Sequence, residues 1–510
     1  MESLSNRVLI VVFDALRPEC VTPELMPTLC SLASKGARYT NMRSVFLSET
    51  RVAQSTLATG CWPRGHGIMA NKLMAPALCP DAVLNTQDDV ALEAAALRTG
   101  GRLLARATLS ERLARVGRSY ASLSAGTPGG GRLIHHDAAT TGRFRLAMRR
   151  PEATVPEGAL AAITQAVGPM PAFSLPARAW TRWAVDAYLG YVEPVHAPDV
   201  MLLWLNEPDE TFHFRGIGSE DARVAIAHAD QMLARLIAHH RAALDEGALS
   251  IIALSDHGQI TLRGAPLDLV ARLQDAGFAA AGQPGPGIDV VVVGDNAGGF
   301  WLRTPDEAKR TQLERALIAW WQGQAFAGPL FTRSTHAGTF TLADVFIDHP
   351  HAPDIAFVCA GDESANAHGF YGMTTHDAGY PIGGGCHGGL SRQEMSNVLV
   401  LAGKAFACAH IDTPAGLVDI APTVMALLGH DIEAGTEANI GAGVDGRVLR
   451  EAFASASASA SAYVGAGAPA PPAWNRTVTQ AVTPDGARTY HLSHFNLADG
   501  ARYIDHAWST

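Results

Sequence analysis

Nearly continuous apolar runs recur along the chain, separated by segments whose apolar residues have helical spacing. A short apolar run without alternating polar positions predicts a strand buried on both faces. Residues 219–244 predict a long amphipathic helix, and residues 26–35 predict a shorter one. This alternation of strands and helices predicts an α/β fold. The three clearest strand runs are Arg7–Phe13, Val200–Leu205 and Leu249–Leu254.

Each of these runs leads into side chains that bind metal ions well. Asp14 follows the first run, Asp209 and His213 follow the second, and Asp256 with His257 follows the third. Asp and His are also ordinary turn residues. Open α/β folds, however, place their sites at the carboxyl ends of strands. The recurrence at three strand ends therefore favours a metal site over three unrelated turns.

Two other positions add candidate chemistry. His387 lies within the glycine-rich stretch 383–389, where it offers another imidazole. Thr50 opens a predicted helix that stops at Gly60. A hydroxyl at a helix start is either an N-cap or, because helix N-termini attract anions, a nucleophile for a phosphoryl group. Taken by itself, the position of Thr50 is compatible with both roles.

Together these motifs resemble the alkaline phosphatase superfamily, and within it the type I phosphodiesterase and nucleotide pyrophosphatase family. The resemblance includes the pattern TG..P..HGI..N, which ends at Asn71. It covers residues 7–71 and 200–257 and returns at residues 387–428. It implies a doubly wound, mostly parallel sheet with helices on both faces, which is an alkaline phosphatase-like core, plus an inserted cap region.

The resemblance also implies two zinc ions, although manganese or iron would suit the same ligands nearly as well. Both ligand sets mix carboxylate oxygen with imidazole nitrogen, a combination that zinc accepts. The i, i+4 spacing of Asp209 and His213 would put both side chains on one face of a helical turn. One ion would be held by Asp14, Thr50, Asp256 and His257, and the other by Asp209, His213 and His387.

The activity implied is hydrolysis of a phosphoric diester or anhydride in a small phosphorylated substrate. Thr50 would attack phosphorus to form a covalent phosphothreonine-type intermediate, and Asn71 would donate a hydrogen bond to a nonbridging phosphoryl oxygen. A neutral donor suits the single negative charge of a diester better than the dianion of a monoester. Two alternatives are a carbon to phosphorus bond hydrolase resembling phosphonoacetate hydrolase and a noncatalytic zinc-binding relative. A binding protein needs neither Thr50 nor Asn71, which favours an enzyme.

Two departures from the family's pattern concern the substrate. The family commonly has Phe, Pro and Asn after its nucleophile, and the Phe helps to hold a nucleobase, whereas this chain has Arg51, Val52 and Ala53. Arg51 either engages an additional anionic group or points to solvent in a salt bridge. Phe212 replaces the glycine usually found before the histidine of the second ligand set. These changes bear on the identity of the substrate rather than on the chemistry.

Composition excludes several classes of protein. The formal charge of −10 over 510 residues, without a Lys/Arg-rich block, argues against a nucleic-acid scaffold. Seven scattered cysteines fit neither a disulfide framework nor a zinc knuckle. The first apolar run is broken by Asp14 and is too short for a signal segment or a membrane span. We therefore expect a cytoplasmic protein without membrane association, and no particular oligomeric state is indicated.

The same motifs suggest domain boundaries. Residues 126–131 are glycine-rich but lack the Lys of a P-loop, so they are expected to form a loop, and residues 362–380 a mobile one beside the site. His228, His239 and His240 on the long helix are not expected to bind metal. The expected parts are 1–82, core with the nucleophile; 83–198, an insert lining the active site; 199–450, core with the remaining ligands; 451–473, an Ala/Ser/Pro linker; and 474–510, a C-terminal hairpin.

Overall fold

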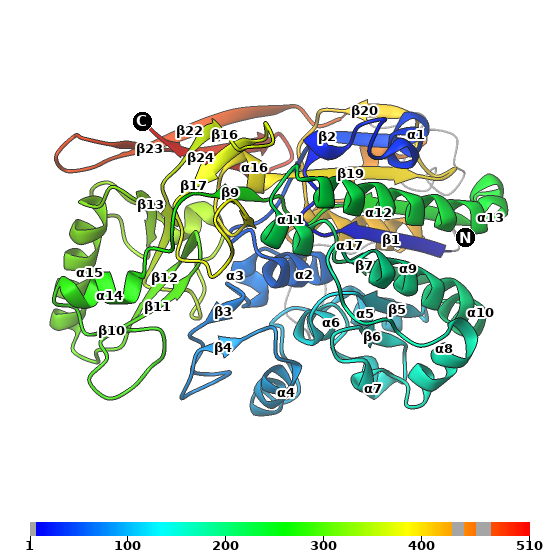
Figure 1. Ribbon diagram of the computed structural model, residues 1–510, viewed down its shortest axis with the longest axis horizontal. Helices are drawn as coiled ribbons and strands as arrows, with labels where there is room; N and C mark the ends of the chain where they lie inside the picture. The colour runs from blue at the N-terminus through cyan, green and yellow to red at the C-terminus, as the bar shows by residue number, and fades with distance from the viewer. Residues whose placement is uncertain (1–6, 431–442, 455–470) are drawn as a thin grey trace.

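The three apolar runs lie side by side at the centre of one sheet. The computed structural model describes residues 7–430, 443–454 and 471–510. The first run, β1, pairs in parallel with both of the others, β7 and β8. The expected α/β core with a mostly parallel sheet is therefore confirmed (Figure 1). Across this nine-stranded sheet the order is β20 (Ala409–Ile411), β2 (Ala37–Arg43), β19 (Ser396–Ala402), β8 (Leu249–Leu254), β1 (Arg7–Phe13), β7 (Val200–Leu205), β5 (Tyr120–Ser124) and β6 (Arg145–Ala147), with β21 (Ala415–Gly416) beside β2.

Both faces of the sheet are buried, which explains why the strand runs lack polar alternation. In β1, Ile10 and Val12 pack into one apolar cluster, whereas Val11 and Phe13 pack into the cluster on the opposite face. All four side chains are fully buried. Burying such a side chain contributes about 1.5–3 kcal/mol. The central strands are therefore fixed by packing from two directions.

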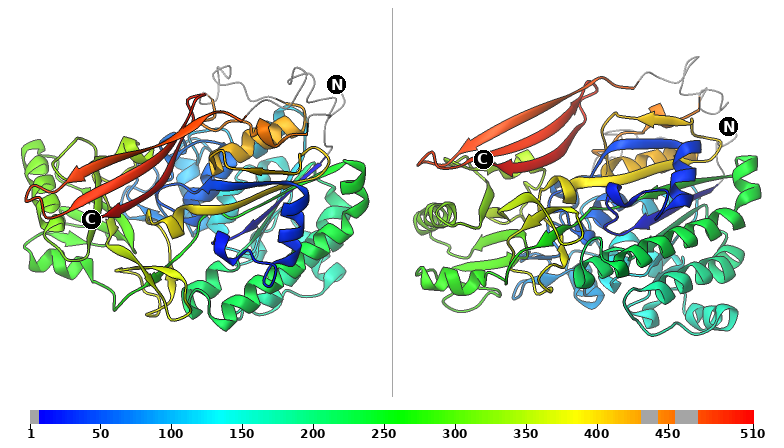
Figure 2. Two further views of the ribbon diagram at one scale, coloured as in Figure 1. Left: turned by 90° about the horizontal axis from the view of Figure 1, so that it is seen from above. Right: turned by 45° about the horizontal axis from the view of Figure 1, so that its top comes forward.

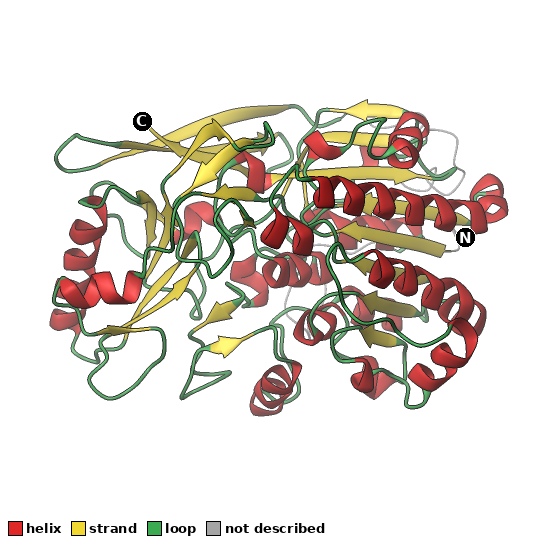
Figure 3. Ribbon diagram, viewed as in Figure 1, coloured by secondary structure: helices red, strands yellow, loops and turns green. Residues whose placement is uncertain are grey.

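Helices cover the two faces of the sheet (Figure 3). α2 ends at Gly60, whose φ of 68° is the left-handed conformation that favours glycine after a helix. The predicted long helix ends at His239, and a separate short helix follows it. On one face lie α1 (Pro27–Lys35), α8 (Ala159–Val167), α9 (Arg178–Ala187), α12 (Glu220–His239) and α13 (Arg241–Glu246), and on the other lie α2 (Thr50–Thr59), α4 (Asp89–Arg98), α5 (Leu109–Arg115), α6 (Pro128–Ile134) and α17 (Ile420–Leu427).

A second, six-stranded sheet lies beside the core, at the left of Figure 1. It has its own apolar cluster, which includes Phe300, Trp321 and Phe357. α14 (Leu269–Asp275) and α15 (Glu307–Gln322) contribute to that cluster. Its strands in order are β10 (Ala280–Ala281), β11 (Val290–Gly294), β12 (Ala297–Leu302), β15 (Ile355–Cys359), β13 (Ala327–Thr332) and β14 (Phe340–Thr341).

A small four-stranded sheet contains much of the segment 362–380. We expected a loop there, and that expectation was wrong for residues 362–365 and 371–374, which belong to two strands that pair antiparallel. β17 also pairs with β9, which follows His257 in the chain. Backbone pairing thus orders a polar sequence that carries little strand signal of its own. The order is β16 (Gly361–Ala365), β17 (Tyr371–Thr374), β9 (Ile260–Leu262) and β18 (Gly385–Cys386).

Residues 83–198, expected as an insert, supply two strands of the central sheet, β5 and β6. The glycine-rich stretch 126–131, expected as a loop, instead enters helix α6. Thr127 caps this helix through its side chain, and Pro128 occupies the first turn, so the start signal outweighs the glycines. Shorter elements in and before the segment are α3 (Pro63–His66), β3 (Lys72–Leu73), β4 (Leu84–Asn85) and α7 (Ala138–Thr141).

The C-terminal segment forms a three-stranded antiparallel sheet, drawn in orange to red in Figure 2. The expected hairpin corresponds to β22 (Trp474–Val482) and β23 (Thr489–Leu497), and β24 (Arg502–Ser509) joins it. β24 attaches to the body of the protein through the Ala507 amide, which donates to the Leu390 carbonyl at 2.8 Å. Of the predicted linker 451–473, residues 455–470 lie outside the described residues.

A buried ion pair connects this terminal sheet to the core, and it gives a testable prediction. Arg43 of β2 donates to Asp505 of β24 at 2.9 Å, and both side chains are less than one-tenth exposed. Arg476 also pairs with Asp505, at 2.8 Å, so loss of Arg43 removes one of two cations beside this carboxylate. We expect Arg43→Ala to lower the free energy of unfolding by about 2 kcal/mol, the scale of a hydrogen bond to a charged group. Urea unfolding measures this loss, and an unchanged midpoint would contradict it.

Within the described residues, no helix is both long and apolar enough to span a membrane.

Candidate active site

The predicted metal ligands meet at the carboxyl edge of the central sheet. Asp14 follows β1, and Asp256 and His257 follow β8. Asp209 and His213 lie on α11 (Asp209–Arg215), the short helix after β7. Because these three strands are adjacent and parallel, their carboxyl ends lie at one edge, where sites of open α/β folds occur.

One cluster of ligand atoms surrounds His257. Its Nε2 lies 3.2 Å from Asp256 Oδ2 and 3.6 Å from Asp14 Oδ1. The hydroxyl of Thr50, at the first position of α2, lies 3.1 Å from the same nitrogen. All four side chains are buried. The structure thus brings together the whole set that was predicted for the first ion.

A second cluster surrounds Asp209. Its Oδ1 lies 3.2 Å from His213 Nε2 and 3.6 Å from His387 Nε2. The same oxygen accepts from the side-chain amide of Gln259 at 2.6 Å, a partner that the sequence pattern did not reveal. The rings of His257 and His387 stack with centroids 4.0 Å apart. The two clusters are therefore contiguous, and Asp209, His257 and His387 also have ligand atoms within 4.8 Å of one another.

All three imidazoles are held in a common manner. His257 Nδ1 contacts the Gly258 carbonyl at 3.0 Å, and His387 Nδ1 contacts the Ser48 carbonyl at 2.9 Å. His213 Nδ1 contacts the Gly385 carbonyl at 2.8 Å. A carbonyl that accepts from Nδ1 places the proton there and leaves Nε2 as the free ligand atom. Each Nε2 faces the carboxylates, as a metal-binding histidine requires.

Two buried carboxylate oxygens at the site have no hydrogen-bond donor among the described residues, Asp14 Oδ1 and Asp256 Oδ2. The other oxygen of each is satisfied, by the Trp204 indole at 2.8 Å and by the Ala15 amide at 3.0 Å. Burial raises the pKa of both carboxyl groups, and neighbouring carboxylates raise it further. A cation between them would relieve this cost, so the residues present fit a bound metal ion.

Charge in the second cluster is balanced differently. Burial acts to raise the pKa of Asp209, yet the nearby His213 and His387 hold it well below its usual range. Burial likewise opposes the protonation of His213, but Asp209 raises its pKa overall. The pKa of His387 is lowered well below its ordinary value by burial and by His257. A largely neutral His387 beside an ionised Asp209 is the protonation state that metal ligation needs.

Two glycines permit the close packing of the ligand loops. A side chain at Gly258 would place its Cβ 2.0 Å from the Gln393 carbonyl. A Cβ at Gly385 would lie 2.0 Å from the side-chain oxygen of Gln259. The glycine-rich stretch around His387 therefore serves close approach rather than flexibility.

Asn71 lies beside the candidate nucleophile. Its side-chain oxygen accepts from the Arg51 amide at 3.2 Å, next to Thr50 at the start of α2. The backbone amide of Asn71 donates to the Glu49 carboxylate. Burial raises the pKa of Glu49 to about 7. The side-chain oxygen of Asn71 is engaged by the Arg51 amide, so its side-chain nitrogen remains as a donor. Asn71 and Thr50 line the same pocket.

A pocket of about 330 Å³ opens onto Thr50, Asp209 and His387. Several of its residues were not predicted individually. Tyr380 stacks on His213 with centroids 4.0 Å apart, so it forms part of the wall beside the second cluster. The sequence signal for Tyr380 was its place at the end of residues 362–380, which were expected to lie beside the site. Other lining residues that were missed are Glu49, Lys72, Gln87, Thr127, Arg149, Glu210 and Asp295.

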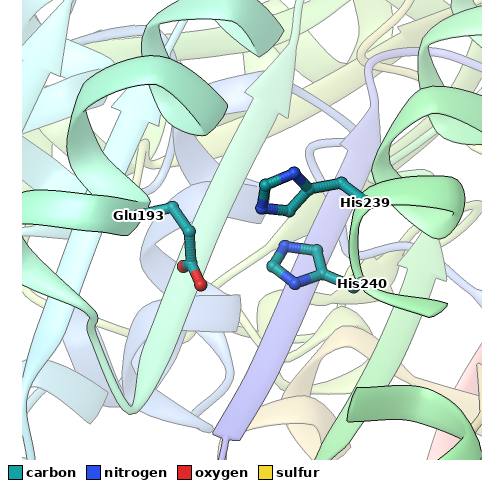
Figure 4. Close-up of side chains that lie close together, drawn as sticks. All are labelled: Glu193, His239 and His240. Atoms are coloured by element: carbon teal, nitrogen blue, oxygen red, sulfur yellow. The ribbon is translucent and has the colours of Figure 1, made fainter. Parts of the chain in front are cut away.

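Another group of ligand-type side chains, none of which lines this pocket, is drawn in Figure 4. Glu193 of α10 (Glu193–His196) lies near His239 and His240 at the end of α12. Its carboxylate already accepts two hydrogen bonds from Arg7, and Tyr188 bonds both Glu193, at 3.3 Å, and His240, at 2.9 Å. These contacts satisfy Glu193 and His240 without an ion. The group therefore serves as a hydrogen-bond network where β1 begins, at the opposite end of the strand from Asp14.

Comparisons with known proteins bear on the chain as a whole. The sequence profile described as "Type I phosphodiesterase / nucleotide pyrophosphatase" matches residues 8–316. No protein of curated function matches the chain in sequence. Among solved structures, murine ectonucleotide pyrophosphatase/phosphodiesterase 5 is similar at a TM-score of 0.56 and 16% identity, over 83% of this chain and 95% of the murine chain. An inactive variant of it, in complex with AMP, matches with the same values.

Proposed function

The chain belongs to the type I phosphodiesterase/nucleotide pyrophosphatase family, and from this membership we propose how its site acts. The family makes it a phosphoric diester hydrolase. We propose that Thr50 is the nucleophile and that two zinc ions are bound beside it. The observation that carries the proposal is the position of the Thr50 hydroxyl, 3.1 Å from His257 Nε2, where the two ligand clusters meet.

The ligand sets support two cations of the zinc type. Asp14, Asp256, His257 and Thr50 would hold one, and Asp209, His213 and His387 the other. Mixed carboxylate and imidazole ligands suit zinc, and manganese or iron accept the same atoms. When bound, such ions supply positive charge for the developing negative charge on the reacting oxygens.

Hydrolysis would proceed in two displacements at phosphorus. In the first, the Thr50 hydroxyl gives up its proton, its oxygen bonds to phosphorus, and the bond from phosphorus to the leaving oxygen breaks. In the second, water attacks the phosphothreonine, and the Thr50 oxygen leaves and regains a proton. Thr50 opens a helix of ten residues, so the backbone dipole of α2 favours an anion at this oxygen.

Asn71 would stabilise the transition state by donating to a nonbridging oxygen. Loss of one such donor costs about 10²–10³ in kcat. We therefore expect Asn71→Ala to lower kcat by about that factor and Asn71→Asp to lower it further, because aspartate keeps the acceptor for the Arg51 amide but repels the phosphoryl oxygens. Steady-state kinetics on one diester measures both variants, and equal activity of Asn71→Asp and the native chain would remove Asn71 from this role.

The function itself is tested by a panel of substrates. Zinc-loaded protein is assayed with bis-p-nitrophenyl phosphate, p-nitrophenyl phosphate and phosphonoacetate. We expect kcat/KM for the diester to exceed that for the monoester by about tenfold or more, because a neutral Asn71 donor suits a monoanion. Preferred release of phosphate from phosphonoacetate would instead identify a carbon to phosphorus bond hydrolase. Absence of turnover with all three would identify a noncatalytic zinc-binding relative.

A nucleotide is the substrate class to examine next. The murine relative binds AMP in an inactive variant whose threonine is replaced by alanine. The pocket here offers Tyr380 and Phe214 as aromatic side chains near Thr50, with ring centroids 5.5 Å apart. We propose that a nucleoside 5′-phosphodiester is cleaved at this site, and product analysis that detects release of the mononucleotide would test it.

A further inference from the structure

Arg51 is a cation at the mouth of the active site that forms no ion pair with any described residue. Its side chain lines the pocket directly after Thr50. Its Nε is shielded from solvent and has no hydrogen-bond acceptor. Among the described residues, no carboxylate oxygen lies within 4 Å of its guanidinium, so the salt bridge that the sequence allowed is not formed there. A half-buried guanidinium without an anion is costly, which indicates that another molecule supplies one.

The other charges of the pocket define where that anion fits. Lys72 also lines the pocket and is likewise unpaired within the described part of the chain. Arg149, by contrast, is already bonded to Glu210. Asp295 lines the same pocket but does not come within ion-pairing distance of Arg51. Glu49 lines the pocket as well, but neither Arg51 nor Lys72 comes within ion-pairing distance of it. Positive charge is therefore available at Arg51 and Lys72, because neither forms an ion pair with a described residue.

We propose that Arg51, with Lys72 beside it, is the binding site for a second anionic group of the substrate, separate from the phosphoryl group that reacts. This inference rests on the proposed function and narrows it to substrates that carry a carboxylate or a further phosphoryl group near the scissile phosphorus. A guanidinium forms two parallel, charge-assisted hydrogen bonds with either group. Arg51 contributes to selecting the substrate and does not touch the atoms that react.

Calorimetric titration of the zinc-loaded protein with phosphonates tests this site without turnover. Methylphosphonate carries one anionic group, 3-phosphonopropanoate adds a carboxylate, and methylenediphosphonate adds a second phosphoryl group. The native chain is compared with Arg51→Ala, Arg51→Lys and Arg98→Ala, since Arg98 is an exposed arginine far from the pocket lining. Zinc content is measured after each titration, so that chelation by a probe is recognised.

We expect at least one two-anion probe to bind the native chain and Arg98→Ala about tenfold more tightly than methylphosphonate. Arg51→Ala should lose this preference while methylphosphonate affinity changes by less than about twofold, and Arg51→Lys should keep part of it. The probe that binds more tightly than methylphosphonate shows whether the second anion is a carboxylate or a phosphoryl group. The inference is overturned if Arg51→Ala binds the two-anion probes with the same preference as the native chain. It is also overturned if Arg51→Ala loses affinity equally for all three probes. If the native chain hydrolyses a diester but shows no preference for two-anion probes, only this inference is overturned. If it neither hydrolyses a diester nor binds methylphosphonate, the proposed function is overturned.

Discussion

Replacing Thr50 by alanine is expected to lower diester turnover by at least about 1,000-fold, the scale of loss when a nucleophile is removed. The change deletes the only protein atom that bonds to phosphorus in the proposed mechanism. Bound zinc should stay near the native stoichiometry, because Asp14, Asp256 and His257 keep their ligand atoms in place. Steady-state kinetics and elemental analysis of the same preparation measure both quantities.

Thr50→Ser is the matched control for this experiment, since it keeps the hydroxyl and removes only a methyl group. It should retain much of the activity, and mass spectrometry after a rapid quench should detect a phosphorylated hydroxyl in the native chain. Turnover by Thr50→Ala near the native rate would remove Thr50 as nucleophile. A Thr50→Ala protein that lacks zinc would instead show that the hydroxyl is needed mainly as a ligand.

Removing the metal is the second change with a large expected effect. Without a cation, the carboxylates of Asp14 and Asp256 are buried together, and burial raises the pKa of both. Asp256 and Asp209 raise the pKa of Asp14 further, and Asp209 also raises that of Asp256. EDTA should abolish turnover and lower the melting temperature, and added zinc should restore both. Zinc at a thousand times its dissociation constant stabilises the folded chain by about 4 kcal/mol. Differential scanning calorimetry with and without zinc measures the shift.

Two variants test whether zinc binds at the proposed active-site clusters or at the group formed by Glu193, His239 and His240. Asp256→Asn should remove most of the stabilisation by zinc, because one ligand oxygen becomes an amide. His239→Ala should leave zinc stoichiometry at two per chain, because Glu193 there is bonded to Arg7. A reduced zinc stoichiometry in His239→Ala would show that the group of Glu193, His239 and His240 binds an ion. Equal zinc stabilisation of Asp256→Asn and the native chain would contradict the ligand assignment.

Local sequence predicted the parts of the fold that are buried on both faces. β1, β7 and β8 were recognisable because a strand covered on two sides has no polar alternation, and their adjacency follows from the parallel α/β pattern. That arrangement accounts for the convergence of Asp14, Asp209 and Asp256 at one edge. The family was also predicted from these motifs, and the profile match confirms it.

Features that depend on distant partners were not predictable in the same way. β16 and β17 are strands because they pair with each other and because β17 also pairs with β9, whereas the segment 362–380 that contains them is polar and glycine-containing. Helix α6 depends on Thr127 and Pro128 at its start rather than on helix-forming residues. Gln259 follows the ligands Asp256 and His257 closely in the chain, but an amide side chain gave no metal-binding signal, and Tyr380 reaches the site only through the fold.

The attachment of β24 links the C-terminal sheet to the loop that carries His387. The Leu390 carbonyl, three residues beyond His387, accepts from Ala507, and Glu394 in turn holds the Gly389 amide at 2.7 Å. The loop that carries His387 is thus supported from outside the central sheet. Loss of β24 would be felt first at the second ligand cluster, so the proposed second ion would be held more weakly while the ligands of the first cluster stay in place.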